Sequence, residues 1–303
     1  MKVLIIGLGS IAKKHINALI KINAEVEIWA LRSSIESTNI DGVNNLYDYC
    51  EITNTKFDFV IISNPTSLHA ETIKELIKYD LPMFIEKPVF NKIIGEKIIQ
   101  EIKNKGLITY SACNLRFLES LKFSRDFIRN KVINEVNSYC GSYLPDWRPD
   151  TDFRKIYSAN KEMGGGVHID LIHEMDYIYW FFGMPNKLSS IMTSNSSLHI
   201  SAYDYTNYNL KYDRFSVNII LNYYRRDSKR TLEILTNEGT LFVDLLANNV
   251  SYKNKIIFES NKTILDTYED QLRFFIKNIL EKKEEFNTIN EAYQILKLCL
   301  QED

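Results

Sequence analysis

Lys2–Ala12 reads KVLIIGLGSIA, and this stretch decides the fold of the N-terminal half of the chain. The apolar run Lys2–Ile6 is typical of a strand buried on both faces of a parallel sheet. It leads directly into a GxGxxA loop, and apolar residues at helical spacing follow. A strand, a glycine-rich loop and a helix in this order predict a dinucleotide-binding fold more strongly than the motif alone.

The residues of this loop predict how a pyrophosphate would bind. Gly7 and Gly9 permit a tight turn and a close approach of the phosphates, and Ala12 lets the helix pack near the strand. The first turn of a helix carries unpaired N–H groups and a partial positive charge. We therefore expect Ser10 and Ile11 to lie beside the cofactor too. His15, one turn further on, is predicted to be a packing residue.

The second predicted strand, Val26–Leu31, bears on the choice of cofactor. NAD-binding folds usually place Asp or Glu at its end, where the carboxylate bonds the ribose 2′-OH. This chain has Arg32 and Ser33 there instead. A guanidinium beside a hydroxyl suits a 2′-phosphate, so the sequence favours NADP over NAD. The alternative is that Arg32 is a solvated loop residue or stacks on the adenine.

Three further predicted strands, at 57–62, 82–85 and 108–112, end in polar residues. Ligands of open α/β sheets bind outside the carboxyl ends of the strands, so these residues are expected to face the cofactor. They are Asn64, Pro65, His69, Glu86, Lys87 and Asn114. Proline at position 88 favours an extended conformation of Lys87, from which its amine projects into the cleft.

Strands and helices alternate regularly up to about Phe117, and then the pattern changes. The alternation predicts a doubly wound Rossmann domain over residues 1–117. Residues 118–303 contain alternating strand patterns such as 215–223, and a hairpin turn at Glu238-Gly239. They predict a second domain, which the family resemblance described below implies to be an α+β domain that binds substrate. Its strands have apolar faces that need a covering layer, which favours an oligomer interface.

Gly164–Gly183 reads GGGVHIDLIHEMDYIYWFFG and is predicted to be one long buried helix entered through three glycines. Glycine lets the backbone adopt positive φ and pass close to another group. Asp170, His173 and Glu174 recur at helical spacing and would share one face. A carboxylate and an imidazole together can perform acid/base catalysis. A structural, hydrogen-bonded Asp–His pair is an equal alternative.

The loop before the glycines is rich in aromatic and basic residues: Trp147, Arg148, Arg154 and Tyr157. Arginine binds two oxygens of a phosphate or carboxylate at once, and the aromatic rings offer a flat surface for a sugar. The loop therefore predicts an anionic sugar substrate, a sugar phosphate or a nucleotide sugar. The alternative is a solvated loop whose arginines pair with its own aspartates.

Bulk properties exclude several classes of function. The 303 residues carry a net charge of −2, which gives no argument for a nucleic acid or an anionic membrane as a partner. The four cysteines lie far apart, so neither a metal site nor a disulfide framework is predicted. No leader or membrane-spanning run is recognisable, which predicts a cytoplasmic protein.

Four motifs occur together in this order: GxGxxA, Glu86-Lys87-Pro88, Asn114-Leu-Arg116-Phe117, and the triple glycine with Asp170. They resemble the glucose-fructose oxidoreductase/inositol dehydrogenase/MocA (Gfo/Idh/MocA) family over essentially the whole chain. The resemblance implies an NAD(P)-dependent oxidoreductase with a Rossmann domain and a large open, mostly antiparallel sheet. It implies a homodimer or homotetramer formed through that sheet, with Arg116 near the substrate.

The resemblance also implies that Lys87, Asp170 and His173 are the catalytic groups, with one departure. The common pattern places histidine four residues after the aspartate, where this chain has Glu174. We expect His173 to be the base because imidazole titrates near neutrality. Glu174 remains the alternative, because burial makes a carboxylate a better proton acceptor. This segment and the loop at 146–149 are similar to a bacterial sugar-biosynthesis branch.

The predicted reaction is hydride transfer between a nicotinamide and a ring carbon of a sugar derivative. His173 would transfer the hydroxyl proton, Lys87 would polarise the reacting oxygen, and Asp170 would orient either group. A dehydrogenase of neutral polyols or inositol is one alternative. A dinucleotide-binding sensor without turnover is the other, because a fold alone does not establish function.

Overall fold

The computed structural model describes residues 1–36 and 39–301. The chain forms two compact units. The first contains residues 1–114 and 265–297, and the second contains residues 115–264 and 298–301. This grouping differs from the predicted division after Phe117, because a C-terminal stretch folds with the N-terminal residues.

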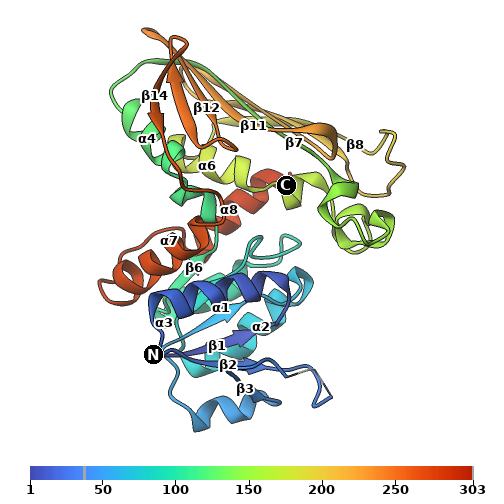
Figure 1. Ribbon diagram of the computed structural model, residues 1–303, viewed down its shortest axis with the longest axis vertical. Helices are drawn as coiled ribbons and strands as arrows, with labels where there is room; N and C mark the ends of the chain where they lie inside the picture. Colours follow the sequence, from blue (N-terminus) through green and yellow to red (C-terminus); the bar gives the residue numbers. More distant parts are fainter. Residues whose placement is uncertain (37–38, 302–303) are drawn as a thin grey trace. The chain divides into compact units, whose positions relative to one another are not determined.

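The first unit is built on a six-stranded parallel sheet with strand order β3-β2-β1-β4-β5-β6 (Figure 1). Its strands are β1 (Lys2–Ile6), β2 (Glu27–Leu31), β3 (Val43–Leu46), β4 (Phe59–Ile62), β5 (Met83–Ile85) and β6 (Thr109–Ser111). The strand order reverses between β1 and β4, which is where ligands of doubly wound sheets bind. The predicted Rossmann fold is confirmed.

Helices cover this sheet, and their apolar sides form its core. They are α1 (Ser10–Ile22), α2 (His69–Leu76), α3 (Glu96–Lys105), α7 (Thr267–Phe274) with a π-helical continuation (Phe275–Leu280), and α8 (Ile289–Leu300), whose last turn belongs to the second unit. Figure 1 shows α7 beside α1, which it contacts. Phe275 places its ring 5.1 Å from Phe59 and 5.3 Å from Phe84, between centroids. The apolar side of this C-terminal segment is therefore buried in the core of the first unit.

The second unit is built on an eight-stranded sheet with strand order β14-β13-β12-β11-β7-β10-β9-β8. The strands are β7 (Ile133–Tyr143), β8 (Lys187–Thr193), β9 (Tyr205–Lys211), β10 (Ser216–Asn222), β11 (Tyr224–Thr236), β12 (Gly239–Asp244), β13 (Asn249–Tyr252) and β14 (Lys255–Glu259). Among the described strands of this sheet, β10 and β7 pair in parallel and the other pairs are antiparallel. The expected large, mostly antiparallel sheet is thus confirmed, with the predicted hairpin between β11 and β12.

The second unit contains the α-helices α4 (Glu119–Phe127), α5 (Val167–Asp170) and α6 (His173–Phe182). α4 contacts strands β12 to β14 and α6 contacts β7 (Figure 1). Val217 and Ile219 of β10 are fully buried, whereas Ser216, the first residue of this strand, is exposed. This alternation is the predicted half-buried strand.

Within the described ranges 1–36 and 39–301, every helix is too short or too polar to cross a bilayer.

Candidate active site

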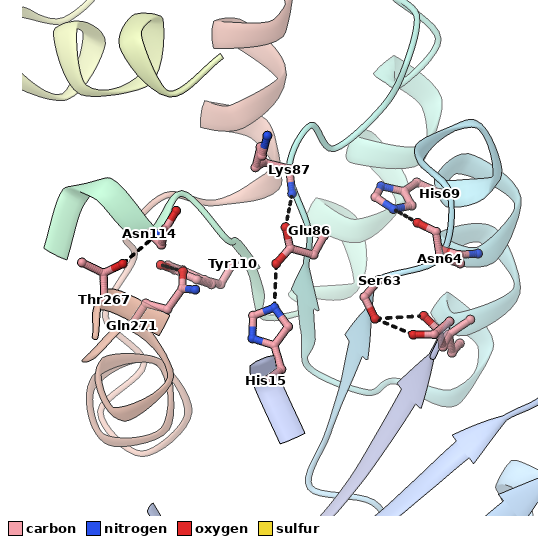
Figure 2. A network of polar contacts seen from close by, with 12 residues as sticks. His15, Ser63, Asn64, His69, Glu86, Lys87, Tyr110, Asn114, Thr267 and Gln271 are labelled. Carbon is pink, nitrogen blue, oxygen red and sulfur yellow. Dashed lines mark hydrogen bonds and ion pairs between the residues drawn. The ribbon is translucent and has the colours of Figure 1, made fainter. Parts of the chain in front are cut away.

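Gly7 joins the two loops that follow β1 and β4. Its φ is +91°, and a methyl group in place of its hydrogen would lie 2.4 Å from both Cα and N of Asn64. Ser63 Oγ donates a hydrogen bond of 2.8 Å to the carbonyl of Gly7 (Figure 2). Only glycine fits at this position, because the loop after β1 passes so close to the loop after β4.

Gly9 faces open space instead. No heavy atom lies within 4 Å of the position that a methyl group would occupy, and Gly9 caps α1 without a side-chain hydrogen bond. The first turn of α1 contains no acidic residue. An uncapped helix N-terminus that is free of negative charge and open above its glycine fits the pyrophosphate of a dinucleotide.

Arg32 lies just beyond β2. Its Nη1 donates a hydrogen bond of 3.0 Å to Oδ1 of Asn45, in β3, and its backbone N–H bonds the carbonyl of Leu46. Ser33 beside it is exposed. The guanidinium is therefore held at the ends of β2 and β3, where the sequence predicts that the ribose binds.

His69 joins two segments of the first unit through its ring nitrogens. Its ring is almost fully buried, with Nε2 3.0 Å from the carbonyl oxygen of Asn64 and Nδ1 3.2 Å from that of Val89. Burial lowers the pKa of His69. The ring therefore joins the backbone of Asn64 to that of Val89, and its predicted contact with the cofactor stays a prediction. Pro65, at the start of this turn, is exposed.

Glu86 links two parts of the first unit (Figure 2). Its Oε1 lies 2.6 Å from Nε2 of His15, and its Oε2 accepts a hydrogen bond of 3.2 Å from the backbone N–H of Lys87. Lys87 lies two residues beyond Ile85, the last residue of β5, and its peptide bond to Pro88 is cis. His15 is thus more than a packing residue, which the spacing along the helix did not indicate.

Asn114 is buried, and its Nδ2 donates a hydrogen bond of 2.7 Å to Oγ1 of Thr267, the first residue of α7 (Figure 2). The hydroxyl of Tyr110 makes a similar bond to Gln271 on the same helix. The amide predicted to touch the cofactor therefore fastens α7 to the sheet.

The triple glycine in the second unit shows both predicted properties. Gly164 and Gly166 have φ of +83° and +139°. A methyl group on Gly165 would lie 2.0 Å from the carbonyl oxygen of Tyr157. Any side chain larger than hydrogen would therefore displace the loop that precedes the helices.

The predicted single helix is broken between Asp170 and His173. Leu171 has φ −98° and ψ 32°, outside helical geometry, so α5 ends at Asp170 and α6 begins at His173. The expectation that Asp170, His173 and Glu174 share one continuous helix face is wrong. Asp170 and Glu174 instead bind different residues, Tyr223 and Arg230 respectively.

Asp170 is bonded by a residue that the sequence did not identify. Tyr223, fully buried between β10 and β11, donates a hydrogen bond of 2.6 Å to Oδ2 of Asp170. Burial and the neighbouring carboxylate raise the pKa of Tyr223 well above its usual value. The phenol therefore keeps its proton and holds Asp170 in place.

Glu174 is fully buried, and both of its oxygens bind Arg230 of β11. Nε lies 2.6 Å from Oε1, and Nη2 lies 3.0 Å from Oε2. Burial opposes the charge of Arg230, but the Glu174 carboxylate outweighs it and raises the pKa of the guanidinium. A carboxylate in such a two-point pair is a poor proton acceptor. The pair with Arg230 favours a structural role for Glu174 over the predicted alternatives of a base or a substrate ligand.

Arg116 is also committed to the interior. Its guanidinium makes two hydrogen bonds to Asp176, of 2.9 and 2.8 Å, and both side chains are essentially inaccessible to solvent. The buried pair favours a structural role for Arg116 over the predicted substrate contact, because each charge neutralises the other. His173, by contrast, is partly exposed at the first position of α6.

The loop at 144–163 keeps its basic residues at the surface. Arg148 is exposed, and Arg154 lies 3.9 Å from Asp152 with 57% of its side chain exposed. Trp147 packs its ring edge-on to Tyr223, at 5.4 Å between centroids. The hydroxyl of Tyr157 bonds the carbonyl of Gly164, which ties the loop to the triple glycine.

No group of His, Cys, Asp and Glu side chains in the described part of the chain is arranged to hold a metal ion.

Comparisons with known proteins agree with this architecture. Residues 1–111 match a family model described as an oxidoreductase family with an NAD-binding Rossmann fold. Residues 123–242 match the model of the GFO/IDH/MocA C-terminal domain. The rhizopine catabolism protein MocA of Rhizobium meliloti is 24% identical over 205 residues, which cover 64% of this chain and 61% of that relative.

Two solved structures share the fold over nearly the whole chain. Levoglucosan dehydrogenase in complex with NADH has a TM-score of 0.85 at 16% identity. The similarity covers 99% of this chain and 95% of the levoglucosan dehydrogenase chain. UDP-N-acetylglucosamine 3-dehydrogenase GnnA from Acidithiobacillus ferrooxidans has a TM-score of 0.79 at 15% identity, with coverages of 99% and 96%.

Proposed function

Because this chain belongs to the Gfo/Idh/MocA family of oxidoreductases, we propose that it transfers a hydride between a nicotinamide cofactor and a ring carbon of a sugar derivative. The observation that carries the assignment of the acid/base group is the pair of Glu174 and Arg230. Arg230 binds both oxygens of the Glu174 carboxylate, the alternative base, in the interior, whereas His173 is partly exposed. An accessible imidazole can exchange a proton near neutral pH.

The residues of this chain then have distinct tasks. His173 takes the hydroxyl proton during oxidation and returns it during reduction. Lys87 donates a hydrogen bond to the reacting oxygen and stabilises negative charge on it. Asp170, which accepts a hydrogen bond from Tyr223, orients His173 or Lys87. The nicotinamide, when bound, accepts or supplies the hydride.

The cofactor is held by the loop of the first unit. Gly7, Gly9 and the first turn of α1 bind the pyrophosphate, with Ser10 and Ile11 at the helix N-terminus. Arg32 and Ser33, beyond β2, bind the 2′-phosphate of NADP.

We expect wild-type protein to bind NADPH more tightly than NADH, and Arg32→Ala to narrow that difference. The guanidinium attracts a dianionic phosphate that NADH lacks. Fluorescence titration of both cofactors measures the two dissociation constants. Equal or tighter binding of NADH by the wild-type protein would show that Arg32 does not select the phosphate.

The substrate is an anionic sugar, which the loop at 144–163 recognises. The Arg154–Asp152 separation of 3.9 Å and the exposure of both side chains make their pairing weak, so it competes little with a phosphate. Arg148 is exposed in the same loop. GnnA acts on a nucleotide sugar, by its name, whereas levoglucosan is a neutral sugar derivative.

A thermal-shift screen of sugar phosphates, nucleotide sugars and neutral sugars, with NADPH present, identifies the ligand class from the stabilisation that binding produces. With the best substrate, Arg148→Ala or Arg154→Ala should raise KM for the phosphorylated sugar far more than for its neutral parent. Lys161→Ala, which removes a charge from a different part of the loop, is the control. Equal turnover of the neutral sugar or inositol, with both arginines dispensable, would favour a polyol dehydrogenase.

We also propose that the chain forms a homodimer or homotetramer through the eight-stranded sheet. Ile191 of β8 and Phe242 of β12 are exposed, although Leu241 and Val243 on either side of Phe242 are fully buried. Large apolar side chains on a sheet face are typical of an interface. Light scattering should give a multiple of the chain mass, and Ile191→Lys or Phe242→Lys should reduce it. A wild-type monomer at micromolar concentration would contradict this proposal.

A further inference from the structure

His15, Glu86 and Lys87 form a chain of hydrogen bonds inside the first unit (Figure 2). Glu86 Oε1 lies 2.6 Å from His15 Nε2, and the other oxygen accepts the backbone N–H of Lys87 at 3.2 Å. An ionised carboxylate only accepts hydrogen bonds, so Nε2 must carry a proton. Nδ1 of His15 has no hydrogen-bond partner among the described residues, so the bond to Glu86 is the hydrogen bond that the ring makes there.

The imidazole of His15 is held firmly in place. It is fully buried, and its ring packs edge-on to Phe84 at 5.1 Å and to Tyr268 at 5.8 Å between centroids. Phe84 belongs to β5, two residues before Glu86, and Tyr268 belongs to α7. Strand β5, which leads to Lys87, and helix α7 therefore both hold the His15 ring in place. This ring in turn holds the Glu86 carboxylate by a hydrogen bond.

We propose that His15 is a positioning residue for Lys87 and acts through Glu86. The carboxylate of Glu86 accepts the backbone N–H of Lys87. The orientation of this carboxylate therefore determines the direction of the backbone at Lys87, beyond the end of β5. Removing the donor at His15 leaves a buried carboxylate oxygen unsatisfied, and the carboxylate then turns toward water. The catalytic importance of this arrangement rests on the proposed role of Lys87, because a displaced polarising group loses much of its effect.

The backbone amide of Lys87 reports on this network without any assay of activity. In protein labelled with ¹⁵N-lysine, Lys87→Arg identifies the resonance. His15→Leu should shift that resonance and speed its hydrogen exchange, whereas His15→Gln, which keeps an N–H donor, should restore both. Glu86→Gln provides a second variant of the same network that preserves volume. Leu19→Ala, at a buried position elsewhere on α1, is the control for lost stability and should leave the resonance unchanged.

Activity measurements then connect the network to catalysis. With the substrate found by screening, His15→Leu should lower kcat by about 10-fold or more at an unchanged cofactor KM, and His15→Gln should recover most of the loss. A Lys87 resonance that stays in place in both His15→Leu and Glu86→Gln overturns the proposal. Equal impairment of His15→Gln and His15→Leu also overturns it, because packing would then explain the effect. A shifted resonance in an enzyme that tolerates Lys87→Met would instead refute the proposed role of Lys87 and leave the network intact.

Discussion

His173→Ala and Lys87→Met should each lower kcat by about 10²-fold or more, the usual scale for a positioned acid/base group. Both variants should bind NADPH with nearly the wild-type dissociation constant, because neither residue belongs to the loop that holds the pyrophosphate. Steady-state kinetics give kcat, and fluorescence titration gives cofactor affinity. A loss in kcat without a loss in cofactor affinity identifies groups that act on the reacting oxygen.

Glu174→Gln is the informative comparison, because it neutralises the adjacent residue while preserving its volume. Glu174 is bound at two points by Arg230 in the interior, so this change should lower the melting temperature. Activity of the folded fraction should remain close to wild type. Retained activity in His173→Ala, combined with lost activity in a stable Glu174→Gln protein, would show that the glutamate is the base.

Arg116→Met should reduce the free energy of unfolding by about 3–5 kcal/mol, the cost of leaving a buried charge without its partner. Asp176 is fully buried and receives both hydrogen bonds from this guanidinium. The double variant Arg116→Met/Asp176→Leu should recover most of that loss, because apolar groups of similar volume replace the pair. Urea titration of each protein gives the three free energies.

Arg129→Met tests the same change in an exposed pair. Arg129 and Asp126 are 2.9 Å apart, but more than two thirds of each side chain is accessible to solvent. Solvent screens such a pair, so this variant should be nearly as stable as the wild type. If Arg116→Met proved equally harmless, the guanidinium would not be needed for stability and its assignment to the substrate site would regain support.

The amino-acid sequence determined the features that depend on neighbouring residues. An apolar run before GxGxxA predicted β1, its loop and α1, and the glycines at 164–166 predicted positive φ and a close backbone contact. The sequence also predicted that Lys87 lies just beyond the end of a strand. These predictions succeeded because strand and helix periods, and the steric freedom of glycine, are local properties of the chain.

Only the tertiary structure decided which side chains are partners. Tyr223 and Asp170 are 53 residues apart, Arg230 and Glu174 are 56 apart, and His15 and Glu86 are 71 apart. Spacing along one segment placed Asp170 and Glu174 on a common face, but each is held by a residue brought to it by the folded sheet. The same limit applies to α7, because residues 265–297 fold with residues 1–114, which lie far away in the sequence. A buried charge must find its counter-charge wherever packing places one, and spacing within a segment carries no information about that position.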